Sequence, residues 1–108
     1  MAIQVMIKRI IHQGQQAEKV VPLILRLRAL AIYQPGYISS ETWCDIDHPG
    51  DCVVISKWET VEDWNRWKRS KERATIERKI EAIIKEPTEY RIFAPMVARE
   101  GYKDTTIK

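Results

Sequence analysis

The order in which two hydrophobic periodicities follow one another constrains the fold of this chain more than any other feature. Alternation of side chains between two faces, which is typical of strands, occurs in residues 2–11, 37–44, 52–58 and 89–93. Apolar residues three and four positions apart, which are typical of amphipathic helices, occur in residues 17–32 and 61–85. The order β-α-β-β-α-β predicts an α+β, ferredoxin-like fold, in which two helices cover one face of a four-stranded antiparallel sheet.

Turn-forming residues mark the boundaries of these stretches. Gln34–Gly36 ends the first helix, and the Asp-, Pro- and Gly-rich loop 45–51 is predicted to join two strands as an antiparallel hairpin. Pro22 falls within the first helical stretch, so the helix is either kinked there or has Pro22 in its first turn. Arg28 interrupts the apolar stripe of the same helix, and the second helix has a candidate interruption near Ser70.

We therefore expect one domain over residues 1–96. Residues 97–108 show no strong pattern and are predicted to form a C-terminal tail or arm. In the first strand, Ile3, Val5 and Ile7 share one face, yet Met6 places an apolar side chain on the other. Two helices can cover only one face of the sheet, and a second copy is the simplest cover for the other. A homodimer joined sheet to sheet is the resulting prediction.

Composition excludes several classes of function. Of the 108 residues, 44% are hydrophobic and 31% are charged, as in an ordinary soluble domain. No apolar run approaches the roughly 18 residues of a transmembrane helix, and the first residues lack the order of a signal peptide. We expect a cytoplasmic protein with no membrane partner. The net charge is only +3, and acids alternate with bases around the second helix, which predicts a solvated face rather than nucleic-acid binding.

The two cysteines, Cys44 and Cys52, flank the predicted hairpin loop. They could therefore face each other across two strands. In a reducing cytosol, however, they are predicted to be small, half-buried apolar side chains rather than a disulfide.

Metal and nucleophile motifs are weak in this sequence. Asp45-x-Asp47-x-x-Gly50 imitates the start of a calcium-binding loop, but Ser56 stands where that loop needs a bidentate Glu, so a hairpin turn is favoured. His12 and His48 lie far apart, and the four glycines are scattered, so neither a metal site nor a phosphate-binding loop is indicated. We predict no metal and no cofactor.

The tryptophans are the most informative aromatic residues. Trp64 and Trp67 lie three positions apart and so share one face of a helix, with at least one of them directed towards the sheet. They are either plain core residues or the wall of an aromatic-lined pocket.

The segments "PGYISSETW" and "VVISKWETVEDWNRW" resemble the antibiotic biosynthesis monooxygenase (ABM) family, and the resemblance spans roughly residues 2–95. It implies a dimeric α+β barrel of two ferredoxin-like protomers, each with a pocket between its sheet and its helices. Some members oxidise anthrone-like phenols with O₂ and use neither metal nor flavin, because the deprotonated substrate is itself the reductant.

The family's site residues carry over only in part. Trp67 matches the second-helix Trp of haem-degrading members, but Glu77 stands where their His would be expected, ten positions on. The first strand offers Lys8 and Arg9 in place of their Asn. Of the set found in anthrone-type members, Asn65 is present, whereas Arg73 replaces the Tyr six positions beyond Trp67.

The resemblance thus predicts a cofactor-independent monooxygenase that acts on a small aromatic or quinol-type molecule. The alternative is a non-catalytic homodimer of the same fold that binds a small ligand or has a structural role. The candidate catalytic residues are Trp67, Asn65, Arg9 and His12. The candidate pocket residues are Tyr37, Trp43, Trp58, Trp64 and Trp67.

Overall fold

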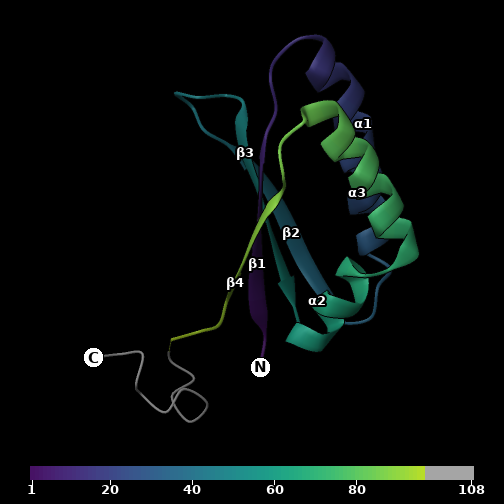
Figure 1. Ribbon diagram of the computed structural model, residues 1–108. Helices are drawn as coiled ribbons and strands as arrows, with labels where there is room; N and C mark the ends of the chain where they lie inside the picture. Colours follow the sequence, from purple (N-terminus) through teal and green to yellow (C-terminus); the bar gives the residue numbers. More distant parts are fainter. Residues whose placement is uncertain (97–108) are drawn as a thin grey trace.

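The computed structural model describes residues 1–96 and arranges them in two layers, a sheet and a layer of helices (Figure 1). The predicted tail or arm, residues 97–108, lies outside the described residues. The elements in chain order are β1 (Ile3–Ile10), α1 (Gln15–Ala31), β2 (Tyr37–Cys44), β3 (Asp51–Trp58), α2 (Val61–Lys68), α3 (Lys71–Ile84) and β4 (Glu89–Phe93).

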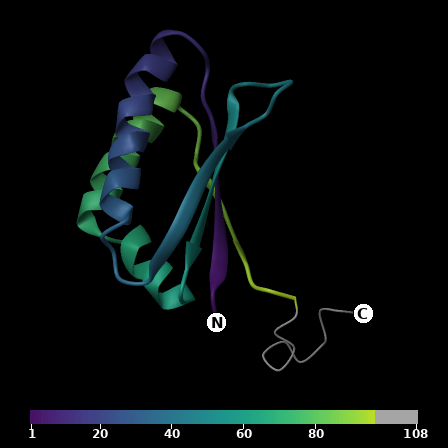
Figure 2. The same cartoon turned by 180° about the vertical axis from the view of Figure 1, so that it is seen from behind.

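The four strands form one antiparallel sheet in the order β2-β3-β1-β4. All three helices lie on the same side of this sheet, with α1 and α3 side by side, as the front and back views show (Figures 1 and 2). The predicted α+β, ferredoxin-like fold is confirmed. Within the described residues, no helix is both long and apolar enough to cross a membrane.

The second helical stretch is divided in two at Ser70. The Ser70 side chain accepts a hydrogen bond from the backbone N–H of Arg73 at 3.2 Å and so caps the start of α3. Thr60 caps α2 in the same way, accepting from the Asp63 N–H at 3.0 Å. Each hydroxyl satisfies a backbone donor that has no partner within its own helix, so two helices replace one long helix.

Helix α1 begins at Gln15, which places Pro22 well inside it rather than in its first turn. Of the two alternatives for this proline, only the interior position is consistent with the structure. Val20 and Leu27 are buried on the face of α1 that meets the sheet. The side chains of Ile3, Val5 and Ile7 meet that face from β1, and Ile76, Ile80 and Ile84 meet it from α3.

Gly36 joins the start of β2 to the start of α2. Its φ is +85°, and a Cβ at this position would lie only 2.2 Å from Oδ2 of Asp63. The Gly36 carbonyl also accepts a hydrogen bond from the N–H of Glu59 at 2.8 Å. Only glycine meets both requirements without strain, so the "PG" and "WET" segments are spatial neighbours.

The β2–β3 hairpin departs from the sequence prediction in one respect. Cys44 and Cys52 pair directly across the two strands and form a disulfide. The expectation of two free apolar side chains was wrong. It was based on the reducing conditions of the cytosol, whereas the strand register places the two cysteines directly opposite each other. In the adjoining loop, the Asp45 carboxylate accepts hydrogen bonds from the N–H groups of Asp47 and His48, the geometry of a turn.

The face of the sheet away from the helices carries a row of apolar side chains. In the strand register, Met6 pairs with Ile55 and Val53 pairs with Trp43 on this face. Trp43 is 57% exposed, and Phe93 at the β4 edge is 48% exposed. We call this set, Met6, Trp43, Val53, Ile55 and Phe93, the open face.

Candidate active site: an arginine-lined cleft beside an aromatic wall

A cleft lies between the sheet and α1 and consists of two adjoining chambers. The inner chamber has a volume of about 50 Å³ and the outer chamber about 180 Å³. The two chambers adjoin each other because five residues line both of them: Arg9, Ile24, Arg28, Thr42 and Val54. Even together, the chambers are smaller than the roughly 300 Å³ of the smallest ordinary ligand pockets, so a ligand that fits must be small.

Aromatic side chains wall the inner chamber. Tyr37 meets Trp58 edge to face, with ring centroids 5.5 Å apart, and Trp58 lies 5.9 Å from Trp64. Trp64 and Trp67 are both buried, and both line the inner chamber. The wall therefore joins three elements, β2, β3 and α2, and offers flat apolar surfaces suited to a planar ring.

Two of the wall's polar groups are already engaged. The Trp58 Nε1–H donates to the Ser56 hydroxyl at 3.0 Å. The hydroxyls of Tyr37 and Ser40 share a hydrogen bond of 2.9 Å. The buried indole is thus satisfied, whereas hydroxyls can still donate to or accept from a ligand, since each carries a donor and two acceptor sites.

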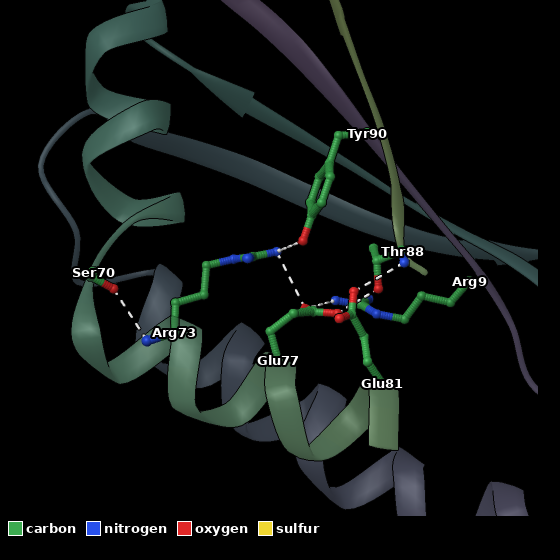
Figure 3. Close-up of polar contacts among 7 residues, drawn as sticks. All are labelled: Arg9, Ser70, Arg73, Glu77, Glu81, Thr88 and Tyr90. Carbon is green, nitrogen blue, oxygen red and sulfur yellow. Dashed lines mark hydrogen bonds and ion pairs between the residues drawn. The ribbon is translucent and has the colours of Figure 1, made fainter. Parts of the chain in front are cut away.

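Three charged side chains form one network (Figure 3), and two of them, Arg9 and Arg73, also line the inner chamber. Arg9 on β1 donates from Nη2 to Oε1 of Glu77 on α3 at 2.8 Å. Arg73, one turn earlier on α3, has its Nη2 at 3.5 Å from the same oxygen. Arg9 is 5% exposed, Arg73 3% and Glu77 7%. Two buried guanidinium groups therefore share one carboxylate.

Hydrogen bonds from β4 and the loop before it complete the network. The Thr88 hydroxyl donates to Oε2 of Glu77, and its N–H donates to the Glu81 carboxylate at 3.1 Å. Arg73 donates to the Tyr90 hydroxyl at 3.0 Å and lies over the Trp64 ring at 5.3 Å. Figure 3 shows the bond from Arg73 to Tyr90. Through its contact with the Trp64 ring, Arg73 also connects the charged network to the aromatic wall.

The network shifts the pKa of two of its members. Burial opposes ionisation of Glu77, but the charge of Arg9 and the hydrogen bonds from Arg9 and Thr88 outweigh it, so the pKa of this carboxyl is lowered. Burial raises the pKa of Tyr90, only partly offset by the Arg73 charge. At neutral pH, Glu77 is an anion and Tyr90 a neutral phenol.

The charge on the cleft is unbalanced. Arg9, Arg28 and Arg73 line it, whereas none of the described lining residues is Asp, Glu or His. Glu77 compensates only one of the two buried arginines. Moreover, Nε of Arg9 is buried and finds no hydrogen-bond acceptor in the part of the chain that the structure describes. An anion in the cleft would offset the excess positive charge.

The structure brings five of the predicted site residues to the cleft: Arg9, Tyr37, Trp58, Trp64 and Trp67. Three others lie elsewhere. Trp43 is on the open face, Asn65 lines neither chamber, and His12 is an exposed residue whose ring lies 3.8 Å from Glu86.

Sequence reasoning missed Arg28 and did not foresee that Arg9, Arg73 and Glu77 form one network. Arg28 did leave a signal, because a charged residue that interrupts the apolar stripe of a helix faces the layer against which the helix packs. The Arg9–Glu77 pair leaves none, since its members are 68 residues apart.

The fold and the cleft define a class: a small α+β domain whose cleft, between sheet and helices, has aromatic and cationic walls. The family model of the antibiotic biosynthesis monooxygenases matches residues 2–79. The chain belongs to this family. Among curated proteins, no significant match was found.

Solved structures share the fold at low sequence identity. A conserved protein from Methanosarcina mazei Go1 superposes with a TM-score of 0.78 at 17% identity, covering 86% of this chain and 91% of that chain. SnoaB, a cofactor-independent oxygenase from Streptomyces nogalater, gives 0.75 at 15% identity, covering 87% and 92%. Rv0793 from Mycobacterium tuberculosis gives 0.77 at 11%, covering 89% and 96%.

Proposed function

We propose that the chain is a cofactor-independent monooxygenase that oxidises a small aromatic or quinol-type molecule in this cleft. The observation that carries the proposal is the pairing of an aromatic wall with two buried arginines that share the single carboxylate of Glu77. Family membership and the likeness to SnoaB, an oxygenase of this kind, support it.

The reaction needs little from the protein. An activated ring CH₂ becomes C=O while O₂ accepts four electrons, and one oxygen atom enters the product while the other leaves as water. The step begins when the substrate loses a proton to solvent water and becomes an oxyanion that can reduce O₂. Cations beside the substrate lower its pKa, so Arg9 and Arg73 favour its ionisation even though the described lining residues hold no carboxylate or imidazole.

Oxygen uptake tests the proposal. A panel of anthrones, quinols and catechols is offered to the wild type and to Trp67→Phe and Trp67→Ala. We expect turnover of at least one compound, with a rate that falls in the order wild type, Phe, Ala, because Trp67 is buried against the inner chamber. Truncating a buried Trp costs about 3–5 kcal/mol of stability, so each variant's fold is checked by circular dichroism.

Tyr33→Ala is the matched control. It also removes an aromatic side chain, but Tyr33 is 81% exposed and lines neither chamber. Its rate should equal that of the wild type. An absence of oxygen uptake and of binding across the whole panel would refute the proposal.

A second candidate is a non-catalytic homodimer that binds a small ligand or has a structural role. It is favoured by the absence of an acid or base among the described lining residues. Binding of a panel compound without its consumption would separate it from the oxygenase. In either case we propose that two protomers associate through the open face.

A further inference from the structure

We infer that the junction between the two chambers binds the carboxylate of a small aromatic acid. The inference rests on the proposed function, because it places a permanent negative charge on the aromatic ligand of the same cleft. It concerns the group that anchors the ligand, not the ring carbon that is oxidised.

Polar side chains from three elements border the junction, one of them buried and two of them exposed. Arg9 of β1, Arg28 of α1 and Thr42 of β2 line the inner and the outer chamber alike. Ile24 and Val54 fill the space between them. Two arginines and a threonine thus border a position that adjoins the aromatic wall.

The charge at this position calls for an anion. Arg9 and Arg73 are both at least nine-tenths buried, and within residues 1–96 the carboxylate bonded to them is that of Glu77. Arg28 adds a third cation at the more exposed side of the cleft. Burial of unbalanced charge is unfavourable, and a ligand anion offsets that cost.

The geometry of Arg9 favours a carboxylate over a single oxygen. Its Nη2 is bonded to Glu77, whereas its Nε is buried and has no acceptor within residues 1–96. Arg9 and Arg28 line the same two chambers. One carboxylate can therefore meet Arg9 with one oxygen and Arg28 with the other, whereas a ligand with a single oxygen has only one such atom to offer.

The shape of the rest of the ligand is inferred from the residues that wall the inner chamber. The inner chamber is walled by Tyr37, Trp58, Trp64 and Trp67 and shares its junction with the outer chamber. A flat ring fits this wall, whereas a long flexible chain does not. The ligand class is therefore a small aromatic acid with its carboxylate at the junction and its ring directed towards the tryptophans.

The inference is tested by ligand titrations of the full chain in the absence of oxygen, with tryptophan fluorescence as the readout. The ligands are 2-naphthoate, its methyl ester and 2-naphthol at neutral pH. We expect the acid to bind about tenfold or more tightly than the ester, the loss expected when a charged hydrogen bond is removed. Equal affinity of the acid and the ester overturns the inference. Equal affinity of 2-naphthol and the acid overturns it too, because a hydroxyl would then suffice.

Variants locate the anion. Arg28→Gln should reduce the affinity for 2-naphthoate about tenfold and leave that for the ester unchanged. Arg26→Gln is the matched control, because Arg26 lies on the same helix, is exposed and lines neither chamber. Equal effects of the two substitutions would contradict the assignment.

Arg9→Lys keeps the charge but removes Nε, and it should also weaken binding of the acid. If this variant does not fold, Arg28→Gln decides alone.

Failure of this inference is distinct from failure of the proposed oxygenase function. A quinol that is oxidised without any preference for acids contradicts only the carboxylate, and selective binding of the acid without oxygen uptake contradicts only the oxidation.

Discussion

Glu77 shows how one residue controls the charge beneath the cleft. It is the buried carboxylate that meets both Arg9 and Arg73, and it also accepts a hydrogen bond from Thr88. Without its charge, two guanidinium groups would remain buried with no anion bonded to them. Because its pKa is lowered on folding, its contribution to stability must depend on pH.

We expect Glu77→Gln to lower the free energy of unfolding at neutral pH by about 3 kcal/mol, as when a buried ion pair loses one partner. The sign of the pH dependence follows from the lowered pKa. The stabilisation is complete above the ordinary value of 4.5 and is lost as the pH falls through the lower folded value. Urea unfolding at a series of pH values should show wild type and variant converging below about pH 4.5.

The control for this series is Glu62→Gln, which removes an exposed carboxylate in the first turn of α2. Its difference from the wild type should be small at every pH. If the difference in free energy of unfolding between Glu77→Gln and the wild type stays constant down to strong acid, the charge of Glu77 is not the source of that difference.

At the scale of elements, the strands and helices could be predicted because periodicity reports which residues of a segment are buried. The cleft could be predicted only in part, and Tyr37 and Trp43 show why. Strict alternation puts both on one face of β2, but an irregularity in the pairing with β3 between Tyr37 and Ser39 reverses the later residues. Tyr37 therefore faces the helices and Trp43 the open face. No local sequence pattern predicts this irregularity.

The junction of β2 with α2 gives the prediction at this scale. Gly36→Ala should destabilise the fold by about 1–3 kcal/mol, because the new methyl group meets both a positive φ and the Asp63 carboxylate. Thermal or urea unfolding measures the loss. We also expect α2 to fray at its start, since the same carboxylate bonds to the Thr60 hydroxyl at 2.9 Å.

Gly14→Ala is a close control for this substitution. Gly14 has a φ of +84°, almost that of Gly36, but a Cβ there would have nothing within 4 Å. It should therefore show the backbone cost alone. If the two substitutions destabilise the protein equally, the contact between Gly36 and Asp63 adds nothing.

At the scale of the whole molecule, the two faces of the sheet have different roles. The helix-covered face supplies the core and the cleft, whereas the open face supplies no contact within residues 1–96 that would bury Trp43 or Phe93. Apolar side chains gathered on one exposed face are typical of an association surface. Pairing two such faces would bury both, in an interface that is the same on each protomer.

We therefore predict that the protein has twice the mass of its protomer in light scattering or native mass spectrometry, and that Trp43→Glu shifts it to the monomer. The physical reason is that a carboxylate would then be buried against the apolar side chains of the paired open faces. Tyr33→Glu places the same charge on an exposed aromatic position outside the open face and should leave the dimer intact. A monomeric wild type would remove the role proposed for this face. A monomeric Trp43→Glu that still binds 2-naphthoate would show that each protomer's cleft is complete by itself.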